Sequence, residues 1–228
     1  MNRRQLIAAA SISAIVRPAL AARPRAVTDK HLLVAGQSLA LRWAWYPAAF
    51  DAFRETRAYM GDTSEWSLTV AAEGGSAMLR ENFPPNFPDR YWWDRLAWTP
   101  GPTLIRSLAK IDGLTFTHAV WIQGQADAAN YADLDWAALK YAYKHAYRAV
   151  SRHLFPSDLM YLNVLEVREP EPVGDQYIRT AHRALIAEGD ALQGAEPNPD
   201  MVKVDGVHPS PVAGCADMGR RVALAIAV

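Results

Sequence analysis

The sequence predicts an α/β protein, a three-layer α/β/α sandwich built on a mainly parallel sheet of five strands. Short β-like runs alternate along the chain with longer segments of helical periodicity, and this alternation is typical of a parallel sheet covered by helices. The chain has 228 residues, of which 50% are hydrophobic and 21% charged. This length and composition are sufficient for one sizeable core, so we expect a single domain over residues 22–228.

The predicted strands are short runs rich in β-branched and apolar residues. They are HLLVAG from His31, SLTVAA from Ser67, FTHAVWI from Phe116, LMYLNVL from Leu159 and MVKV from Met201. The predicted helices cover Pro47 to Met60, Pro102 to Lys110, Asp135 to Leu154, Asp175 to Leu192 and Pro211 to Ala227. In the third helix an apolar stripe at helical spacing indicates a face packed on the core. The stripe consists of Leu139, Tyr143, Ala146, Tyr147, Val150 and Leu154.

The stretch from Glu81 to Pro102 has no helical or strand period and is rich in proline, which predicts a long loop. Its aromatic residues are Tyr91, Trp92, Trp93 and Trp98. Aromatic faces on a loop stack against sugar rings in some proteins and fold back as a satellite core in others. The sequence leaves both interpretations open.

The N-terminus has the order of a secretory signal peptide. Arg3 and Arg4 precede an apolar run of 11 residues, LIAAASISAIV, and Ala19-Leu20-Ala21 provides a small-x-small cleavage site. The run is about half of the ~20 residues that a membrane-spanning helix needs, so we expect no stable membrane anchor. We therefore predict a signal peptide over residues 1–21, of twin-arginine or ordinary type, and a periplasmic or secreted protein.

The charge balance gives no reason to expect nucleic acid as a partner. Lys plus Arg and Asp plus Glu both number 24, so the formal net charge is zero. Cys215 is the single cysteine, so no intrachain disulfide is expected. No cluster of His, Cys or carboxylates has metal-ligand spacing and there is no glycine-rich phosphate loop, so we expect neither a metal nor a cofactor. A small-molecule or saccharide ester fits this composition as substrate.

Polar motifs follow four of the five predicted strands. They are Gly36-Gln37-Ser38, Gly74-Gly75-Ser76, Gln123-Gly124-Gln125-Ala126-Asp127 and Asp205-Gly206-Val207-His208-Pro209. In an open parallel sheet, ligands bind beyond the carboxyl ends of the strands. Each motif alone is weak, but together they predict one site at this sheet edge.

The residue types in these motifs suit nucleophilic catalysis. A serine hydroxyl needs a histidine to accept its proton and a carboxylate to orient that histidine. Asp205 and His208, three residues apart, offer this pair, and Ser38 follows a tight turn at the start of a helix. The alternatives are that Ser38 only caps this helix and that Asp205-Gly206 is only a turn.

An oxyanion hole is predicted from the same motifs. The Ser38 backbone N–H is expected to be unpaired at the helix start, and the Gly75 N–H is expected to add a second donor. We expect the side-chain amide of Gln123 to be a third donor; the alternative is that Gln123 is satisfied locally at its strand end. Asp127 is expected to order the loop after this strand or to cap the next helix.

The motifs GQS, GG followed by Ser, WIQGQAD and DGVHP, in this order, resemble the four sequence blocks of the SGNH (GDSL-like) hydrolases. They resemble most the carbohydrate acetylesterase branch, which includes sialate and xylan acetylesterases. The resemblance covers Gly36 to His208 and implies a flavodoxin-like α/β/α fold. It also implies a nucleophile at Ser38, an acid at Asp205, a base at His208 and oxyanion donors from Ser38, Gly75 and Gln123.

The chain departs from this branch at three positions. Gln125 stands where the branch has Glu, Ala126 where wider SGNH enzymes have the oxyanion Asn, and Leu39 where many relatives have Asn. The function predicted is a serine esterase that hydrolyses O-acetyl or other short acyl esters, on a carbohydrate, through an acyl-enzyme. Alternatives are an O-acyltransferase with the same triad and a non-catalytic carbohydrate-binding protein on the same fold.

Overall fold

The computed structural model describes residues 29–130, 135–155, 160–168 and 173–226. The predicted signal peptide lies outside these residues. Within them the main sheet has five parallel strands in the order β2-β1-β6-β7-β8. The strands are β1 (Lys30–Gly36), β2 (Trp66–Ala72), β6 (His118–Ile122), β7 (Met160–Leu162) and β8 (Leu192–Gln193). The predicted fold class is therefore confirmed.

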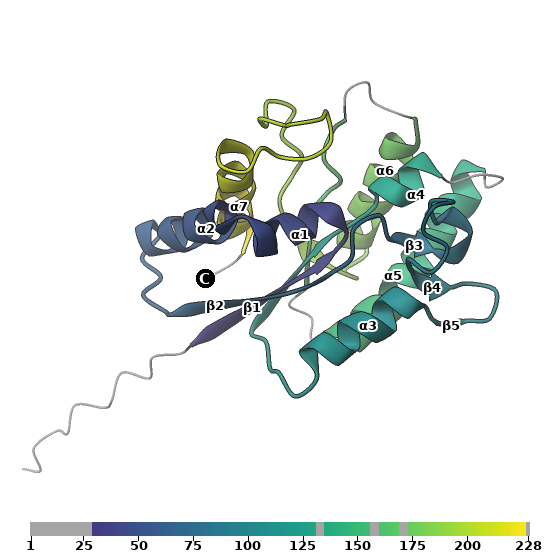
Figure 1. Ribbon diagram of the computed structural model, residues 1–228, viewed down its shortest axis with the longest axis horizontal. Coiled ribbons are helices and arrows are strands. Elements are labelled where there is room, and N and C mark those ends of the chain that lie inside the picture. Colours follow the sequence, from purple (N-terminus) through teal and green to yellow (C-terminus); the bar gives the residue numbers. More distant parts are fainter. Residues whose placement is uncertain (1–28, 131–134, 156–159, 169–172, 227–228) are drawn as a thin grey trace, which may run out of the picture.

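Helices cover both faces of this sheet (Figure 1). One face carries α1 (Ser38–Trp45), α2 (Pro47–Tyr59) and α7 (Ala213–Ala225). The other face carries α3 (Pro102–Ile111), α4 (Gln125–Ala129), α5 (Trp136–Leu154) and α6 (Val173–Ala187). Each face has its own apolar core, because the central strands are buried on both sides. None of the helices in the described ranges is long and apolar enough to cross a membrane.

Helix α5 shows how the sequence pattern becomes packing. All six residues of its predicted stripe are buried, with exposed fractions of 3% or less. The Asp135 side chain caps the helix by accepting the Ala138 N–H at 2.7 Å, which satisfies one of the donors left open at a helix start. The stripe packs against the sheet through Trp121, whose ring meets Tyr147 edge-on.

The fifth predicted strand is wrong. Met201 to Val204 forms no strand of the sheet; β8 at Leu192–Gln193 takes the edge position instead. Val202 and Val204 are 56% and 55% exposed, so this run has no apolar face to bury. It contributes an isolated antiparallel bridge, Lys203 to Pro209, that closes a loop.

The predicted long loop contains two strands of a small second sheet, β4 and β5, and the third strand, β3, lies just before it; the order is β3-β4-β5. Its strands are β3 (Ala77–Leu79), β4 (Tyr91–Asp94) and β5 (Thr99–Pro100), with a 3₁₀ turn over Arg80–Asn82. Trp92 and Trp93 are buried in the core, whereas Trp98 is 52% exposed and packs edge-on against Trp93. The loop therefore folds back on the sheet, and its two buried tryptophans belong to the apolar core on the α5 side.

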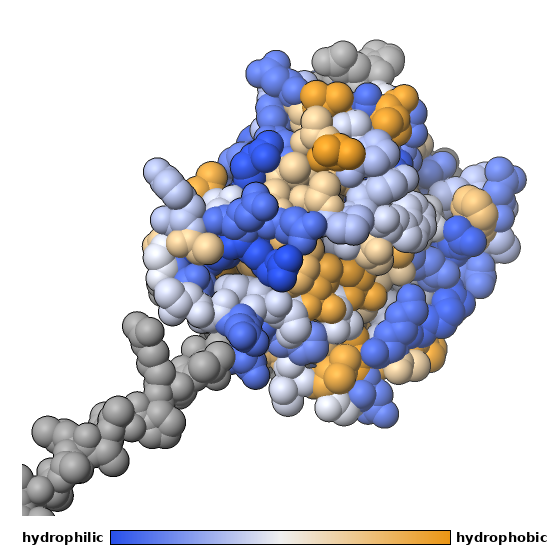
Figure 2. Space-filling model, turned by 60° about the vertical axis from the view of Figure 1, so that its left-hand side comes forward, coloured by the Kyte–Doolittle hydropathy of each residue, from blue (hydrophilic) through white to orange (hydrophobic). Residues whose placement is uncertain are grey.

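The surface is mixed in character. Figure 2 shows one face, on which apolar residues gather near the centre and are bordered by hydrophilic ones.

Candidate active site

Ser38 is held at the carboxyl edge of the sheet by a close approach of two strands. Gly36 ends β1 with φ +137°, and a Cβ there would lie 2.0 Å from the Ile122 carbonyl oxygen, so only glycine fits. The Gln37 N–H donates to the same oxygen at 3.0 Å. Ser38 is then the first residue of α1, where its own N–H has no intrahelical acceptor. The turn therefore presents both a hydroxyl and a free backbone donor.

Asp205 and His208 lie on the loop that the Lys203–Pro209 bridge closes. The Val204 N–H donates to the His208 carbonyl oxygen at 2.9 Å. The Asp205 Oδ1 accepts the N–H groups of Val207 and His208 at 3.1 and 2.7 Å. The Asp-Gly turn is thus organised around the carboxylate, which fixes the position of the histidine that follows.

The structure brings Ser38, His208 and Asp205 into one hydrogen-bonded row. His208 Nδ1 is 2.8 Å from Asp205 Oδ2, and His208 Nε2 is 3.0 Å from Ser38 Oγ. The Asp205 carboxylate can only accept a hydrogen bond, so the His208 ring carries its proton on Nδ1. Its Nε2 is then left to accept from the Ser38 hydroxyl. This is the arrangement in which a histidine removes the proton of a serine nucleophile.

The Asp205 carboxylate is ionised across the ordinary pH range. Partial burial acts to raise its pKa, but hydrogen bonds from the His208 N–H, the His208 ring and the Val207 N–H outweigh it and lower the pKa to about 2. The Asp205 side chain is 51% exposed and the His208 side chain is 27% exposed. The row is therefore accessible from solvent.

The predicted second oxyanion donor, Gly75, lies on a tight turn after β2. Its φ is +72°, and the Phe87 ring lies 3.2 Å from the position a Cβ would take. Arg90 stacks on this ring, with its guanidinium carbon 4.0 Å from the centroid, and donates to the Gly74 carbonyl oxygen at 2.8 Å. Among the described residues no acceptor pairs with the Gly75 N–H. Phe87 and Arg90 therefore hold the turn in place, and the Gly75 N–H remains able to donate to a substrate.

We correct the expectation that Gln123 is an oxyanion donor. Its Nε2 donates to Asp127 Oδ2 at 2.6 Å and to the Ser76 carbonyl oxygen at 3.3 Å, so both amide hydrogens are occupied. Its Oε1 accepts the Tyr143 hydroxyl at 2.6 Å. Asp127 lies one helical turn further along the chain and captures the amide that the strand end presents. The geometry supports the alternative, in which the Gln123 side chain is satisfied locally at its strand end.

The donor and acceptor roles in this buried hydrogen-bond network are fixed by His182, at the end furthest from Asp127. The Leu165 N–H donates to His182 Nδ1 at 3.2 Å, so the neutral ring carries its proton on Nε2 and donates to the Tyr143 hydroxyl, 2.9 Å away. Tyr143 then donates to Gln123. Burial, with a smaller contribution from the Arg179 charge, lowers the pKa of His182 to about 3, which keeps the ring neutral.

Asp127 completes the network and joins it to β3 and to the 3₁₀ turn that follows this strand. Its carboxylate accepts the N–H groups of Met78 and Leu79 and the amides of Asn82 and Gln123, at 2.6 to 3.1 Å. Burial raises its pKa to about 6 even though all four hydrogen bonds favour the charged form. Asp127 contacts the loop after β6 through Gln123, as expected, but its other three donors come from β3 and the 3₁₀ turn, and it does not cap α4.

Removing the Gln123 side chain is expected to lower the stability of the protein. Gln123→Ala leaves the Tyr143 hydroxyl with only the backbone carbonyl of residue 123, at 3.5 Å, as acceptor and leaves Asp127 with three donors. Each unsatisfied buried group costs about 1–3 kcal/mol. We expect the free energy of unfolding in urea to fall by roughly 2–5 kcal/mol. Gln193→Ala, at an exposed position, is the control and should leave the midpoint unchanged. An unaltered urea midpoint for Gln123→Ala would contradict the network.

Gln125 and Gln37 act inside the site rather than at its surface. Gln125 is 5% exposed and borders a small internal space that Glu166, which pairs with Arg221, also borders. Gln37 was not singled out from the sequence. Its Oε1 accepts the N–H groups of Gly124 and Ala126 at 3.2 and 3.4 Å, which ties the turn before Ser38 to the loop after β6.

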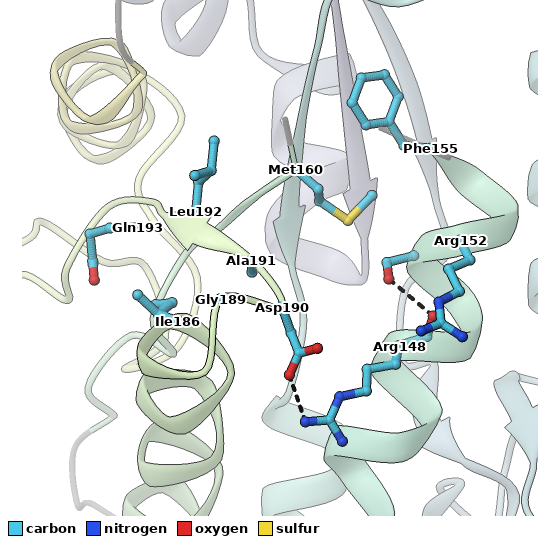
Figure 3. Close-up of a pocket in the computed structure, with 11 residues that line it drawn as sticks. Arg148, Arg152, Phe155, Met160, Ile186, Gly189, Asp190, Ala191, Leu192 and Gln193 are labelled. Atoms are coloured by element: carbon cyan, nitrogen blue, oxygen red, sulfur yellow. Dashed lines mark hydrogen bonds and ion pairs between the residues drawn. The ribbon is translucent and has the colours of Figure 1, made fainter. Parts of the chain in front are cut away.

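A cavity of about 550 Å³ lies at the opposite edge of the sheet (Figure 3). Met160 and Leu192, the first residues of β7 and β8, border it, whereas Ser38 lies two residues beyond Gly36, the last residue of β1. Figure 3 shows Asp190 bonded to Arg148 on its wall, at 2.6 Å. This cavity is separate from the row of Ser38, His208 and Asp205.

Comparison with known proteins gives a likeness in structure and none in sequence. No protein-family model matches the chain, and no curated protein matches it. A lipase/acylhydrolase from Enterococcus faecalis superposes with a TM-score of 0.53 at 12% identity, over 86% of this chain and 94% of that one. A carbohydrate acetylesterase from Xanthomonas citri gives 0.58 at 15% identity, over 85% of this chain and 55% of that one.

A family two carbohydrate esterase from Clostridium thermocellum gives a TM-score of 0.54 at 13% identity, over 86% of this chain and 62% of that one. The chain thus spans little more than half of the two carbohydrate esterases. The shared architecture is an α/β fold, a mainly parallel sheet flanked by helices on both faces. This fold is the one that the sequence motifs imply.

Proposed function

We propose that this protein is a serine esterase in which Ser38 is the nucleophile, His208 the general base and Asp205 the residue that orients the histidine. The observation that carries the proposal is the continuous row from Ser38 Oγ through both nitrogens of His208 to the Asp205 carboxylate, with distances of 3.0 and 2.8 Å. Residues 170 positions apart meet in this row, which a local turn does not explain.

The first half of the reaction forms an acyl-enzyme. His208 Nε2 accepts the hydroxyl proton of Ser38 as Oγ attacks the ester carbonyl carbon. The negative charge moves to the carbonyl oxygen, where the N–H groups of Ser38 and Gly75 stabilise it. The carbon–oxygen bond to the alcohol then breaks, and the alcohol leaves with the proton held by His208.

The second half releases the acid. His208 accepts a proton from water, whose oxygen attacks the acyl carbon, and the Ser38 oxygen leaves with that proton. Asp205 stays ionised throughout and stabilises the charged ring. With Gln123 occupied, two backbone N–H groups supply the oxyanion hole in this mechanism.

We propose an O-acetylated saccharide as the substrate. The four motifs support this, since they resemble the carbohydrate acetylesterase branch, and two solved structures of the same fold are named as carbohydrate esterases. The test is acetate release from an aryl acetate and from acetylated xylan or sialic acid, with and without a sugar acceptor. Acetate release supports a hydrolase, acetyl transfer to the acceptor indicates an acyltransferase, and inactivity on all of them contradicts the proposal.

We also propose that the protein is exported, on the strength of the N-terminal arginines, the apolar run and the Ala19-Leu20-Ala21 site. The mature chain is expected to begin near Ala22 and to be found outside the cytoplasm. N-terminal sequencing of the protein from its native host measures this. Cytoplasmic protein that keeps Met1 would contradict export.

A further inference from the structure

A buried arginine without an acceptor lies one helical turn from the proposed nucleophile. Arg42 belongs to α1 and is 9% exposed, and its Nε is fully buried with no hydrogen-bond partner. Among the described residues no carboxylate, carbonyl or hydroxyl accepts from its guanidinium. Arg57 shows the usual arrangement: it is fully buried and donates to Asp62 and to the carbonyl oxygens of Ala223 and Ile226.

The contacts that Arg42 does make leave its donors unsatisfied. Its guanidinium carbon lies over the rings of Trp45 and Tyr46, 6.0 and 5.1 Å from their centroids. Ring faces attract a cation but accept no strong hydrogen bond from its N–H groups. A buried charge without a hydrogen-bonded counter-charge is costly, and proteins seldom keep one. The Nε atom is covered by the protein, so the two terminal nitrogens, for which the described residues provide no acceptor, are the donors left for an anion from outside the chain.

The position of Arg42 links it to the proposed ester site. Residues four apart in a helix share a face, with Cβ atoms about 5–6 Å apart, so Arg42 and Ser38 are neighbours on α1. Burial raises the pKa of the Cys215 thiol, in α7, to about 11, and the Arg42 charge opposes this rise. Helix α7 begins five residues after His208, on the same face of the sheet as α1 (Figure 1). Trp45 is 57% exposed, so this end of α1 reaches solvent.

We propose that Arg42 binds a carboxylate on the substrate, so that the esters cleaved at Ser38 are acyl esters of acidic sugars. This inference rests on the proposed function. A planar guanidinium matches a carboxylate with two parallel hydrogen bonds, and ring contacts on its face leave the N–H edge for that use. The spacing of one helical turn suits a carboxylate and an acyl ester carried on the same sugar.

Two substrates that differ at one group test the proposal: methyl glucuronoside and methyl glucoside, each acetylated at the same hydroxyl. We expect the wild-type protein to prefer the acidic ester by about tenfold or more in kcat/KM, chiefly through KM, since hydrogen bonds to a charged partner are worth at least that factor. Added salt should reduce the preference. Arg42→Met should abolish it, and Arg42→Lys, which keeps the charge but not the planar donors, should retain part of it.

Arg54→Met is the matched control. Arg54 lies on α2, its side chain is 54% exposed and it pairs with Asp51, so the substitution removes the same charge from a site away from Ser38. The preference should survive this change. Equal rates on the two esters in wild-type protein, or a preference that Arg42→Lys and Arg42→Met both leave intact, would overturn the inference while leaving the esterase standing.

Inactivity of the wild-type protein on both esters and on an aryl acetate would contradict the proposed function instead. If Arg42→Met does not fold, inhibition of the wild-type protein decides the inference. Glucuronate should inhibit aryl acetate hydrolysis at least about tenfold more strongly than glucose, by the same charge-assisted hydrogen bonds. Equal inhibition by the two sugars would overturn it.

Discussion

Ser38→Ala is expected to abolish ester hydrolysis while leaving the fold intact. The hydroxyl is the group that attacks the carbonyl, and losing the nucleophile of a serine triad lowers kcat by a factor on the order of 10⁶. Its hydrogen bond in the structure is to His208, at 3.0 Å, and it has no part in either apolar core. We therefore expect an unchanged melting temperature together with loss of aryl acetate hydrolysis.

Covalent labelling provides an independent measurement of the same assignment. A serine-directed organophosphorus reagent should modify Ser38 in the wild-type protein and leave Ser38→Ala unmodified, as read by mass spectrometry of peptides. Ser67→Ala is the control, because Ser67 lies exposed on β2 and should not affect either result. Activity above a few per cent in Ser38→Ala, or an adduct on another residue, would show that the nucleophile lies elsewhere.

The sequence predicted best what depends on local pattern and on the topology of a parallel sheet. Four of the five strands were found from short apolar runs, and polar motifs follow three of them, β1, β2 and β6. Asp205 and His208 were found because a carboxylate three residues before a histidine reaches its ring within one turn. Ser38 lies just beyond the carboxyl end of β1, as expected, and His208 reaches it from a loop that the Lys203–Pro209 bridge closes.

The failures have physical causes that one sequence does not reveal. The run from Met201 alternates like an edge strand, but Val202 and Val204 face solvent, and the edge is taken by two residues, Leu192–Gln193, too few to recognise. Gln123 ends its strand as expected, yet its amide is captured by Asp127, a contact set by the packing of α4 against β3. In the sequence Arg42 looks like an ordinary helix residue. Only the structure shows that it is buried without a hydrogen-bond acceptor.

Asp205→Asn is expected to lower kcat by a factor on the order of 10⁴ through the proton positions on His208. Three donors converge on the carboxylate: two backbone N–H groups at Oδ1 and the ring Nδ1–H at Oδ2. An asparagine has a single acceptor oxygen, and the two fixed N–H groups hold it on their side. Its NH₂ then faces Nδ1, which must accept instead of donate. The ring proton moves to Nε2, and His208 no longer accepts the proton of Ser38.

The measurement is kcat on an aryl acetate, with folding followed by thermal unfolding at neutral pH and at acid pH. The pKa of Asp205 is lowered in the folded protein, so its ionisation contributes stability above the ordinary carboxyl pKa, and this contribution is lost as the pH falls towards about 2. Asp205→Asn should remove that part of the pH dependence. Asp200→Asn, on an exposed turn of the same segment, should change neither property. A double variant with Ser38→Ala should be no slower than Ser38→Ala alone, because the two residues act as a unit. If Asp205→Asn keeps kcat within about tenfold of wild type, where a triad predicts ~10⁴, Asp205 only shapes the loop and another group orients His208.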